Sequence, residues 1–156
     1  MKIRWKTLIL AIAIPLIVGG LSALITMDSM GLFDTVDKPP LSPPAWLFPV
    51  VWTALYILMG IASYIVFEKT ADMVEKSKAL RVYFLQLAFN FLWSVFFFNF
   101  ELYLFSFFWL LALWVLIIVT AVRFYRISRV AGYLMIPYVI WVTFAGYLNL
   151  GIAILN

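Results

Sequence analysis

The chain has 156 residues, enough for one domain, of which 67% are hydrophobic and 12% are charged. A soluble domain carries about 45–50% apolar and about 25% charged residues, so lipid must solvate most of this chain. The absence of cysteine and histidine excludes disulfides, thiol catalysis, zinc–thiolate sites, histidine acid–base chemistry and His or Cys ligation of haem iron. The net charge of +4 would suit nucleic acid, but the basic residues lie only between apolar runs, so contact with the bilayer is favoured and nucleic acid is not expected.

Five apolar runs separated by charges are each long enough to cross a bilayer as a helix, which takes about 20 residues. A β-barrel is disfavoured because the runs are continuously apolar and lack two-residue alternation. We therefore predict an all-α membrane protein, a single domain over residues 1–156 built as a bundle of five transmembrane helices. The predicted spans are residues 7–27, 45–67, 82–100, 102–122 and 131–155.

The first run follows a basic segment and could be taken for a secretory signal peptide. Its apolar stretch exceeds the roughly 7–15 residues of such peptides, and Leu21-Ser22-Ala23 is a poor cleavage context, so a membrane span is favoured.

The longest connection is the predicted outer loop, residues 28–44, which is too long to be only a turn. We expect it to fold back over the helix ends as a lid, because it contains the apolar residues Met30, Leu32, Phe33, Val36 and Leu41. Prolines crowd the start of the second span, where Pro49 would disturb the first turns, and Pro137 would kink the fifth span.

Basic residues set the orientation. Ten of them flank the spans on one side of the predicted membrane, and Lys38 is alone on the other. By the positive-inside rule, the N-terminus is cytoplasmic, the C-terminus is outside, and the protein is a multi-pass protein of the cell membrane. The ten are Lys2, Arg4, Lys6, Lys69, Lys76, Lys78, Arg81, Arg123, Arg126 and Arg129.

No Asp, Glu, Lys or Arg lies inside a predicted span, which argues against proton-coupled transport, light-driven pumping and ion conduction. Three spans instead carry aromatic and amide side chains at helical spacing. Residues three or four apart share a helix face, and amides avoid lipid, so these stripes should point inward. The stripes are Phe48, Trp52, Tyr56 and Ser63; Gln86, Asn90, Trp93 and Phe97; and Trp141, Ala145 and Asn149 with Phe144 and Leu148 alongside.

The three stripes reach the same depth, in the outer half of the bilayer beneath the outer loop. At about 1.5 Å per residue, Trp52 lies roughly 12 Å below Pro44. A pocket with aromatic walls and a few amide donors would suit a large planar apolar ligand. Helix–helix packing held by amides would explain the same stripes without a ligand, and spacing leaves both interpretations open.

Three blocks of this sequence resemble the TspO/MBR family, the tryptophan-rich sensory proteins and the translocator proteins or peripheral benzodiazepine receptors, as a bacterial-type member. They are PPAWLFPVVWTALYILMG at 43–60, QLAFNFLWS at 86–94 and PYVIWVTFAGYLN at 137–149. The family pattern covers nearly the whole chain.

The resemblance implies a homodimer of five-helix bundles with a ligand cavity under the first loop. It implies binding of porphyrins such as protoporphyrin IX and of benzodiazepine-type ligands, together with light- and oxygen-dependent porphyrin degradation. Trp52 and Trp141 match the tryptophans implicated in that reaction. The stripes and the resemblance together predict ligand contacts from Phe48, Trp52, Tyr56, Gln86, Asn90, Trp93, Trp141, Phe144, Ala145, Leu148 and Asn149.

No metal site and no resident cofactor are expected, so a porphyrin would be ligand or substrate, with Lys38 available to a propionate. Tyr147 is followed by no basic residue, so sterol binding by the pattern of the animal proteins is not supported. The third span also lacks an obvious small-xxx-small pair that would mark a dimer interface. Two other functions stay open: a passive transporter of tetrapyrroles or similar lipophiles, and a ligand-responsive membrane sensor acting on a partner.

Overall fold

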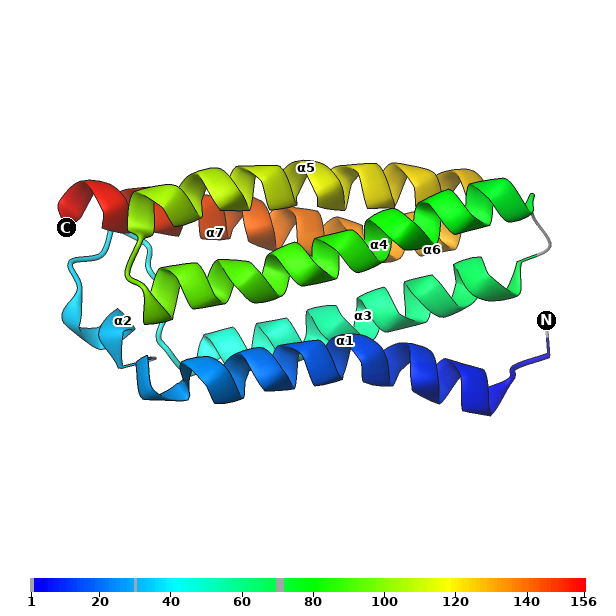
Figure 1. The fold of residues 1–156 in the computed structure, drawn as a ribbon, viewed down its shortest axis with the longest axis horizontal. Helices are drawn as coiled ribbons and strands as arrows, with labels where there is room; N and C mark the ends of the chain where they lie inside the picture. The colour runs from blue at the N-terminus through cyan, green and yellow to red at the C-terminus, as the bar shows by residue number, and fades with distance from the viewer. Residues whose placement is uncertain (1, 30, 70–71) are drawn as a thin grey trace.

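The computed structural model describes residues 2–29, 31–69 and 72–156, which form an elongated helical bundle (Figure 1). Five helical segments are long and apolar enough to cross a membrane, and the described residues contain no strand. The predicted all-α bundle of five membrane spans is therefore confirmed. Met30, which the sequence placed in the lid, lies outside the described residues.

The helices begin and end close to the charges that bound the apolar runs. In chain order they are α1 (Trp5–Thr26), the 3-10 turn η1 (Met27–Ser29), α2 (Leu32–Thr35), α3 (Leu47–Glu68), α4 (Met73–Ser94), the π-helical turn η2 (Val95–Asn99), α5 (Tyr103–Ile127), α6 (Arg129–Leu134) and α7 (Ile136–Leu155).

α4 and α5 extend furthest beyond their predicted spans, at the end where the basic residues gather. α4 begins nine residues before position 82, where Asp72 accepts a hydrogen bond from Val74 N at 2.8 Å and caps the helix. α5 continues to Ile127, and Arg126 lies in its last turn, where a positive charge is favoured by the helix dipole. Charge ends an apolar run, but it does not end a helix that projects into water.

The fifth span is interrupted rather than kinked. α6 ends at Leu134, and α7 begins at Ile136 with Pro137 in its first turn. Proline has no N–H to donate to the preceding turn, so it starts a new helix more easily than it continues one.

Packing between helices leaves room at one end of the bundle. α1 packs along α3, while α4 and α7 both pack against α5. α3 contacts α6 extensively but has few contacts with α7. α3 and α7 therefore diverge toward the end where α7 finishes, beneath the connection between α1 and α3 (Figure 1).

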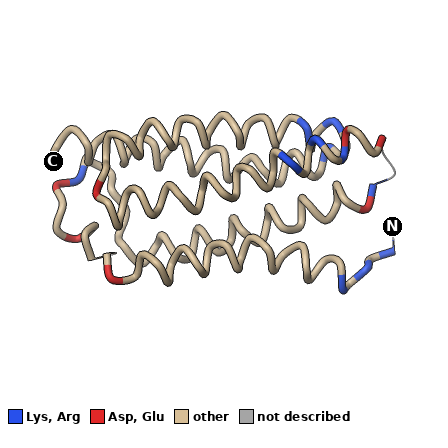
Figure 2. Tube along the Cα trace, viewed as in Figure 1, with Lys and Arg blue, Asp and Glu red and all other residues tan. Residues whose placement is uncertain are grey.

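Charge is distributed unequally between the two ends (Figure 2). We call the end with the ten flanking basic residues the basic end, and the opposite end, with the loop and the C-terminus, the outer end. Lys38 is the basic residue of the outer end, alongside Asp28, Asp34, Asp37 and Glu101. This distribution agrees with the predicted orientation, N-terminus cytoplasmic and C-terminus outside.

The closest crossing of α1 and α3 depends on a glycine and a proline. Pro15 lies inside α1 and cannot donate to the carbonyl of Ala11. A Cβ added at Gly60 would lie 2.6 Å from Ile12 Cα and 2.9 Å from that Ala11 oxygen. The backbones can approach this closely because position 60 has no side chain.

We predict that Gly60→Ala lowers the stability of the bundle by about 1–3 kcal/mol, because the added methyl overlaps backbone atoms that cannot move aside. Gly20→Ala is the matched control, since nothing lies within 4 Å of its added Cβ. The measurement is the thermal unfolding midpoint of both variants in detergent. Equal midpoints for the two would contradict the close crossing.

Candidate functional site

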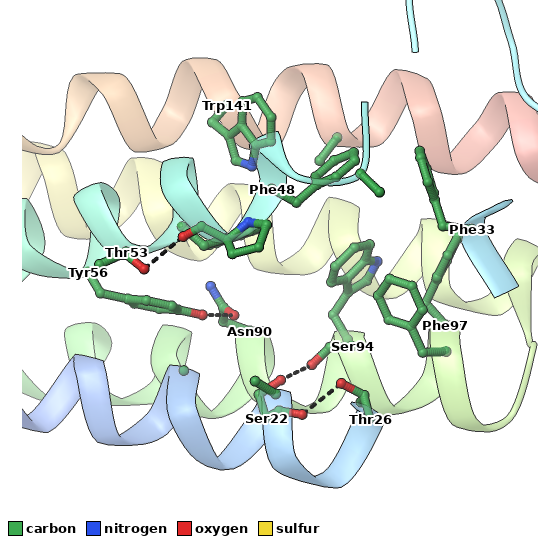
Figure 3. A pocket seen from close by; sticks show the side chains of 18 of the residues that line it. Ser22, Thr26, Phe33, Phe48, Thr53, Tyr56, Asn90, Ser94, Phe97 and Trp141 are labelled. Carbon is green, nitrogen blue, oxygen red and sulfur yellow. Dashed lines mark hydrogen bonds between the residues drawn. The ribbon is translucent and has the colours of Figure 1, made fainter. Parts of the chain in front are cut away.

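A cavity of about 480 Å³ opens among α1, α3, α4 and α7 in the outer half of the bundle (Figure 3). This volume falls within the range of about 300–1,000 Å³ typical of ligand pockets. Its described lining contains no Asp, Glu, Lys or Arg. The lining residues are Leu16, Gly19, Gly20, Ser22, Ala23, Thr26, Phe33, Ala45, Phe48, Pro49, Trp52, Thr53, Tyr56, Asn90, Trp93, Ser94, Phe97, Phe98, Trp141, Ala145, Leu148, Asn149 and Ile152.

The floor of the cavity is a chain of hydrogen bonds that joins three helices. Tyr56 Oη of α3 donates to Asn90 Oδ1 of α4 at 3.1 Å. Asn90 Nδ2 donates to Tyr138 Oη of α7 at 2.7 Å, and that hydroxyl donates to Gln86 Oε1 at 2.7 Å. All four side chains are buried. These hydrogen bonds fix the three helices relative to one another and close the cavity toward the basic end.

A second amide fastens the wall nearer the outer end. Trp93 Nε1 donates to Asn149 Oδ1 at 3.0 Å, and Asn149 Nδ2 donates to the carbonyl of Tyr103 at 2.8 Å. Trp93 also stacks on Phe97, with ring centroids 5.4 Å apart. The π turn η2 follows directly and carries Phe97 and Phe98 to the cavity rim.

The α1 wall is built from small and hydroxyl side chains. Tyr56 lies over Gly19, where an added Cβ would be 2.3 Å from the ring. Ser22 Oγ hydrogen bonds to Ser94 Oγ, and Thr26 Oγ1 donates to the carbonyl of Ser22 at 2.8 Å. These hydroxyls are paired within the protein, so they present little unsatisfied polarity to a ligand.

The outer loop covers the cavity and is fastened to α7. Phe33 is buried, lines the cavity and packs edge-on against Phe48 with centroids 5.0 Å apart. Tyr147 Oη donates to the carbonyl of Pro40 at 2.6 Å. Asn156 exchanges two hydrogen bonds with the backbone of Asp37. The loop therefore folds back over the helix ends, apart from Leu41, which is 85% exposed and has a left-handed φ of 70°.

Lys38 has a different setting from the one expected for a propionate partner. Its Nζ donates to the carbonyls of Phe33 at 2.7 Å and Val36 at 3.3 Å and lies 5.0 Å from the centre of the Phe33 ring. The ammonium group thus binds the backbone of its own loop. Lys38 is not among the described residues that line the cavity.

One fully buried polar atom of the lining has no partner among the described residues. Trp141 Nε1 is buried and makes no hydrogen bond to the described residues. In Figure 3 its indole lies on the wall above the cavity, beside Phe48, with ring centroids 5.8 Å apart. A buried N–H without an acceptor costs free energy, so an acceptor brought within reach of this atom would stabilise it.

Nine of the eleven predicted ligand contacts line this one cavity, and Gln86 and Phe144 do not. Gln86 lies one turn below Asn90 and is used by the floor, where its Nε2 contacts Met59 Sδ at 3.9 Å. Phe144 packs behind Trp141, with ring centroids 5.7 Å apart. The two tryptophans proposed as catalytic, Trp52 and Trp141, both line the cavity.

The contribution of α1 to the cavity was not predicted from the sequence. Six residues of this helix line the cavity, but they form no aromatic or amide stripe. The available signal was the run of small and hydroxyl residues Gly19, Gly20, Ser22 and Ala23, which permits close approach in a membrane helix. Gly20 and Ala23 of α1 and Pro49 and Thr53 of α3 are exposed lining residues, so the cavity opens between these two helices.

Comparison with known proteins supports the resemblance of the three blocks. Residues 11–155 match the TspO/MBR family. The tryptophan-rich protein TspO of Chlorobaculum tepidum is 37% identical over 151 residues, 96% of each chain. The tryptophan-rich sensory protein of Cereibacter sphaeroides is 36% identical over 117 residues, 75% of this chain and 72% of that one. The translocator protein of Homo sapiens is 32% identical over 123 residues, 78% of this chain and 73% of that one.

Two tryptophan variants test the hydrogen bonding of the ligand-free cavity. Trp93→Phe removes the donor to Asn149 and should lower stability by roughly 0.5–1.5 kcal/mol. Trp141→Phe loses a similar volume but removes an N–H that makes no bond, so it should cost less. Thermal unfolding midpoints in detergent without ligand compare them. The assignment of the unpaired donor fails if Trp141→Phe is the more damaging change.

Proposed function

The chain belongs to the TspO/MBR family, and we propose that it is a membrane receptor for porphyrins such as protoporphyrin IX and for benzodiazepine-type ligands. One observation carries the proposal: an aromatic cavity of about 480 Å³ is lined by Trp141, whose buried N–H has no acceptor among the described residues. Homodimer formation, which the resemblance implies, stays a prediction.

The lining chemistry fits a flat apolar ring with few polar atoms. Phe48, Trp52 and Trp141 offer indole and phenyl surfaces from α3 and α7, which favour stacked or edge-on contact with an aromatic ligand. A porphyrin also carries carboxylates, and a carboxylate oxygen could accept from Trp141 Nε1. The absence of histidine and cysteine favours metal-free porphyrin over haem ligated by those residues.

The cavity is better suited to holding a ligand than to passing it across the membrane. Tyr56 and Asn90 close its floor by a hydrogen bond, and Tyr138 and Gln86 continue that chain deeper in the bundle. A ligand moving toward the basic end would have to break bonds between buried groups that have no water to replace them.

We predict that Trp141→Phe weakens protoporphyrin IX binding roughly three- to tenfold, the effect of losing one hydrogen bond while keeping an aromatic surface. Trp114→Phe is the matched control, because its Nε1 donates to Thr143 at 2.9 Å outside the cavity lining. The affinity is measured by absorbance titration of the purified protein in detergent. Binding that is unchanged in Trp141→Phe, or equally weakened in Trp114→Phe, would remove the support for this cavity.

We further infer that the bound porphyrin is degraded in light and oxygen, with Trp52 and Trp141 as the reactive side chains. Excited porphyrin generates reactive oxygen. An adjacent indole can donate an electron to the excited porphyrin or form an adduct with it. The protein supplies orientation and confinement, while the chemistry belongs to the ligand.

The degradation proposal predicts that the porphyrin absorbance decays under light with the wild-type protein and stays constant in the dark. The double variant Trp52→Phe/Trp141→Phe should decay more slowly at equal occupancy, reached by raising the porphyrin concentration. Equal decay rates at equal occupancy would leave the protein a receptor and refute the catalytic role of these tryptophans.

A further inference from the structure

A second hollow lies far from the cavity, between α4 and α5 at the basic end of the bundle. It is a groove of about 290 Å³ on the surface of the two helices. Its lining combines three cations with three aliphatic side chains: Lys78, Arg81, Val82, Leu85, Val119 and Arg123.

The two kinds of side chain occupy different depths. α4 runs away from the basic end, so Lys78 and Arg81 lie nearer that end than Leu85. α5 runs toward the basic end, so Arg123 lies one turn nearer to it than Val119. The cations thus stand at the edge of the apolar spans and the aliphatic side chains lie deeper, opposite the acyl chains of a bilayer.

The acidic side chains of the basic end do not neutralise the two arginines of the groove. Glu68 pairs with Arg4 at 3.2 Å, and Asp72 accepts from Val74 N in the cap of α4. Glu75 lies 3.9 Å from Lys78. Among the described residues, neither Arg81 nor Arg123 has an ion pair within 4.0 Å.

We propose that this groove binds an anionic phospholipid of the leaflet at the basic end. Its phosphate would lie between Arg81 and Arg123, whose planar guanidinium groups suit bidentate contact with phosphate oxygens. One acyl chain would lie along Val82, Leu85 and Val119. Leu85 is 48% exposed. An acyl chain would cover this apolar surface, whereas a free phosphate ion would not. Basic pockets between helices on the cytoplasmic side are typical sites for anionic headgroups.

Native mass spectrometry of the full chain tests the proposal. The protein is taken from detergent after incubation with dioleoyl phosphatidylglycerol or dioleoyl phosphatidylcholine. The wild type should retain phosphatidylglycerol in preference to phosphatidylcholine. Arg81→Gln/Arg123→Gln should bind phosphatidylglycerol roughly tenfold or more weakly. The control Arg126→Gln/Arg129→Gln removes the same charge from the same end, outside the groove lining, and should keep the preference.

A second variant and a competitor complete the test. Leu85→Trp fills the aliphatic half from an exposed position and should reduce retention while leaving all the cations in place. Inorganic phosphate in excess should not displace the lipid. Equal retention of the two lipids, an equal loss in the control, or displacement by inorganic phosphate alone would each overturn the proposal of a phospholipid site.

Discussion

The structure depends on one constraint: buried polar groups inside the bilayer must form hydrogen bonds with one another, because water is absent there. Inside a bilayer each buried donor or acceptor must find a partner in the protein, and an unmade bond is costly. Asn90 meets this constraint by joining Tyr56 to Tyr138, and so holds three helices together below the cavity. Asn149 does the same for Trp93 and Tyr103 nearer the outer end. Three buried polar atoms of the described residues have no partner, namely Tyr83 Oη, Ser106 Oγ and Trp141 Nε1, and Trp141 is the one of these residues that lines the cavity.

The two ends of the bundle present different chemistry to different partners. At the outer end, a loop bound to α7 through Tyr147 and Asn156 covers an uncharged aromatic cavity. At the basic end, cations extend beyond the apolar spans on α4 and α5 and border an aliphatic groove. Hydrogen bonds between buried side chains separate the two regions. The proposed planar ligand at the outer end and the proposed anionic lipid at the basic end would therefore bind without a continuous path between them.

Much of this arrangement was predictable, because membrane spans depend on local composition and stripes on local periodicity. The five spans follow from apolar length, and the facing of Trp52, Asn90 and Trp141 follows from helical spacing. Helical spacing predicts which face of a helix a residue shares, but not the depth at which neighbouring helices separate to form a cavity. Gln86 therefore lies on the predicted face but takes part in the hydrogen bonds of the floor instead of lining the cavity. The α1 wall was not predictable from a stripe, because that helix is apolar on every side. Pro137 predicted a kink in the fifth span, whereas the structure shows a full break at Met135, with Pro137 in the first turn of the new helix.

The central claim is that the Trp141 indole N–H has no acceptor in the ligand-free protein and donates a hydrogen bond to the bound ligand. The most direct measurement is a ¹⁵N–¹H NMR spectrum of the tryptophan indoles of the detergent-solubilised protein, recorded with and without protoporphyrin IX in the dark. The account predicts that the Trp141 indole proton shifts downfield on binding, as expected for a new hydrogen bond. It also predicts that the Trp109 indole proton, already bonded to the carbonyl of Phe89 at 2.9 Å outside the cavity lining, stays near its starting position. A Trp141 signal that does not move at saturating porphyrin would contradict the account.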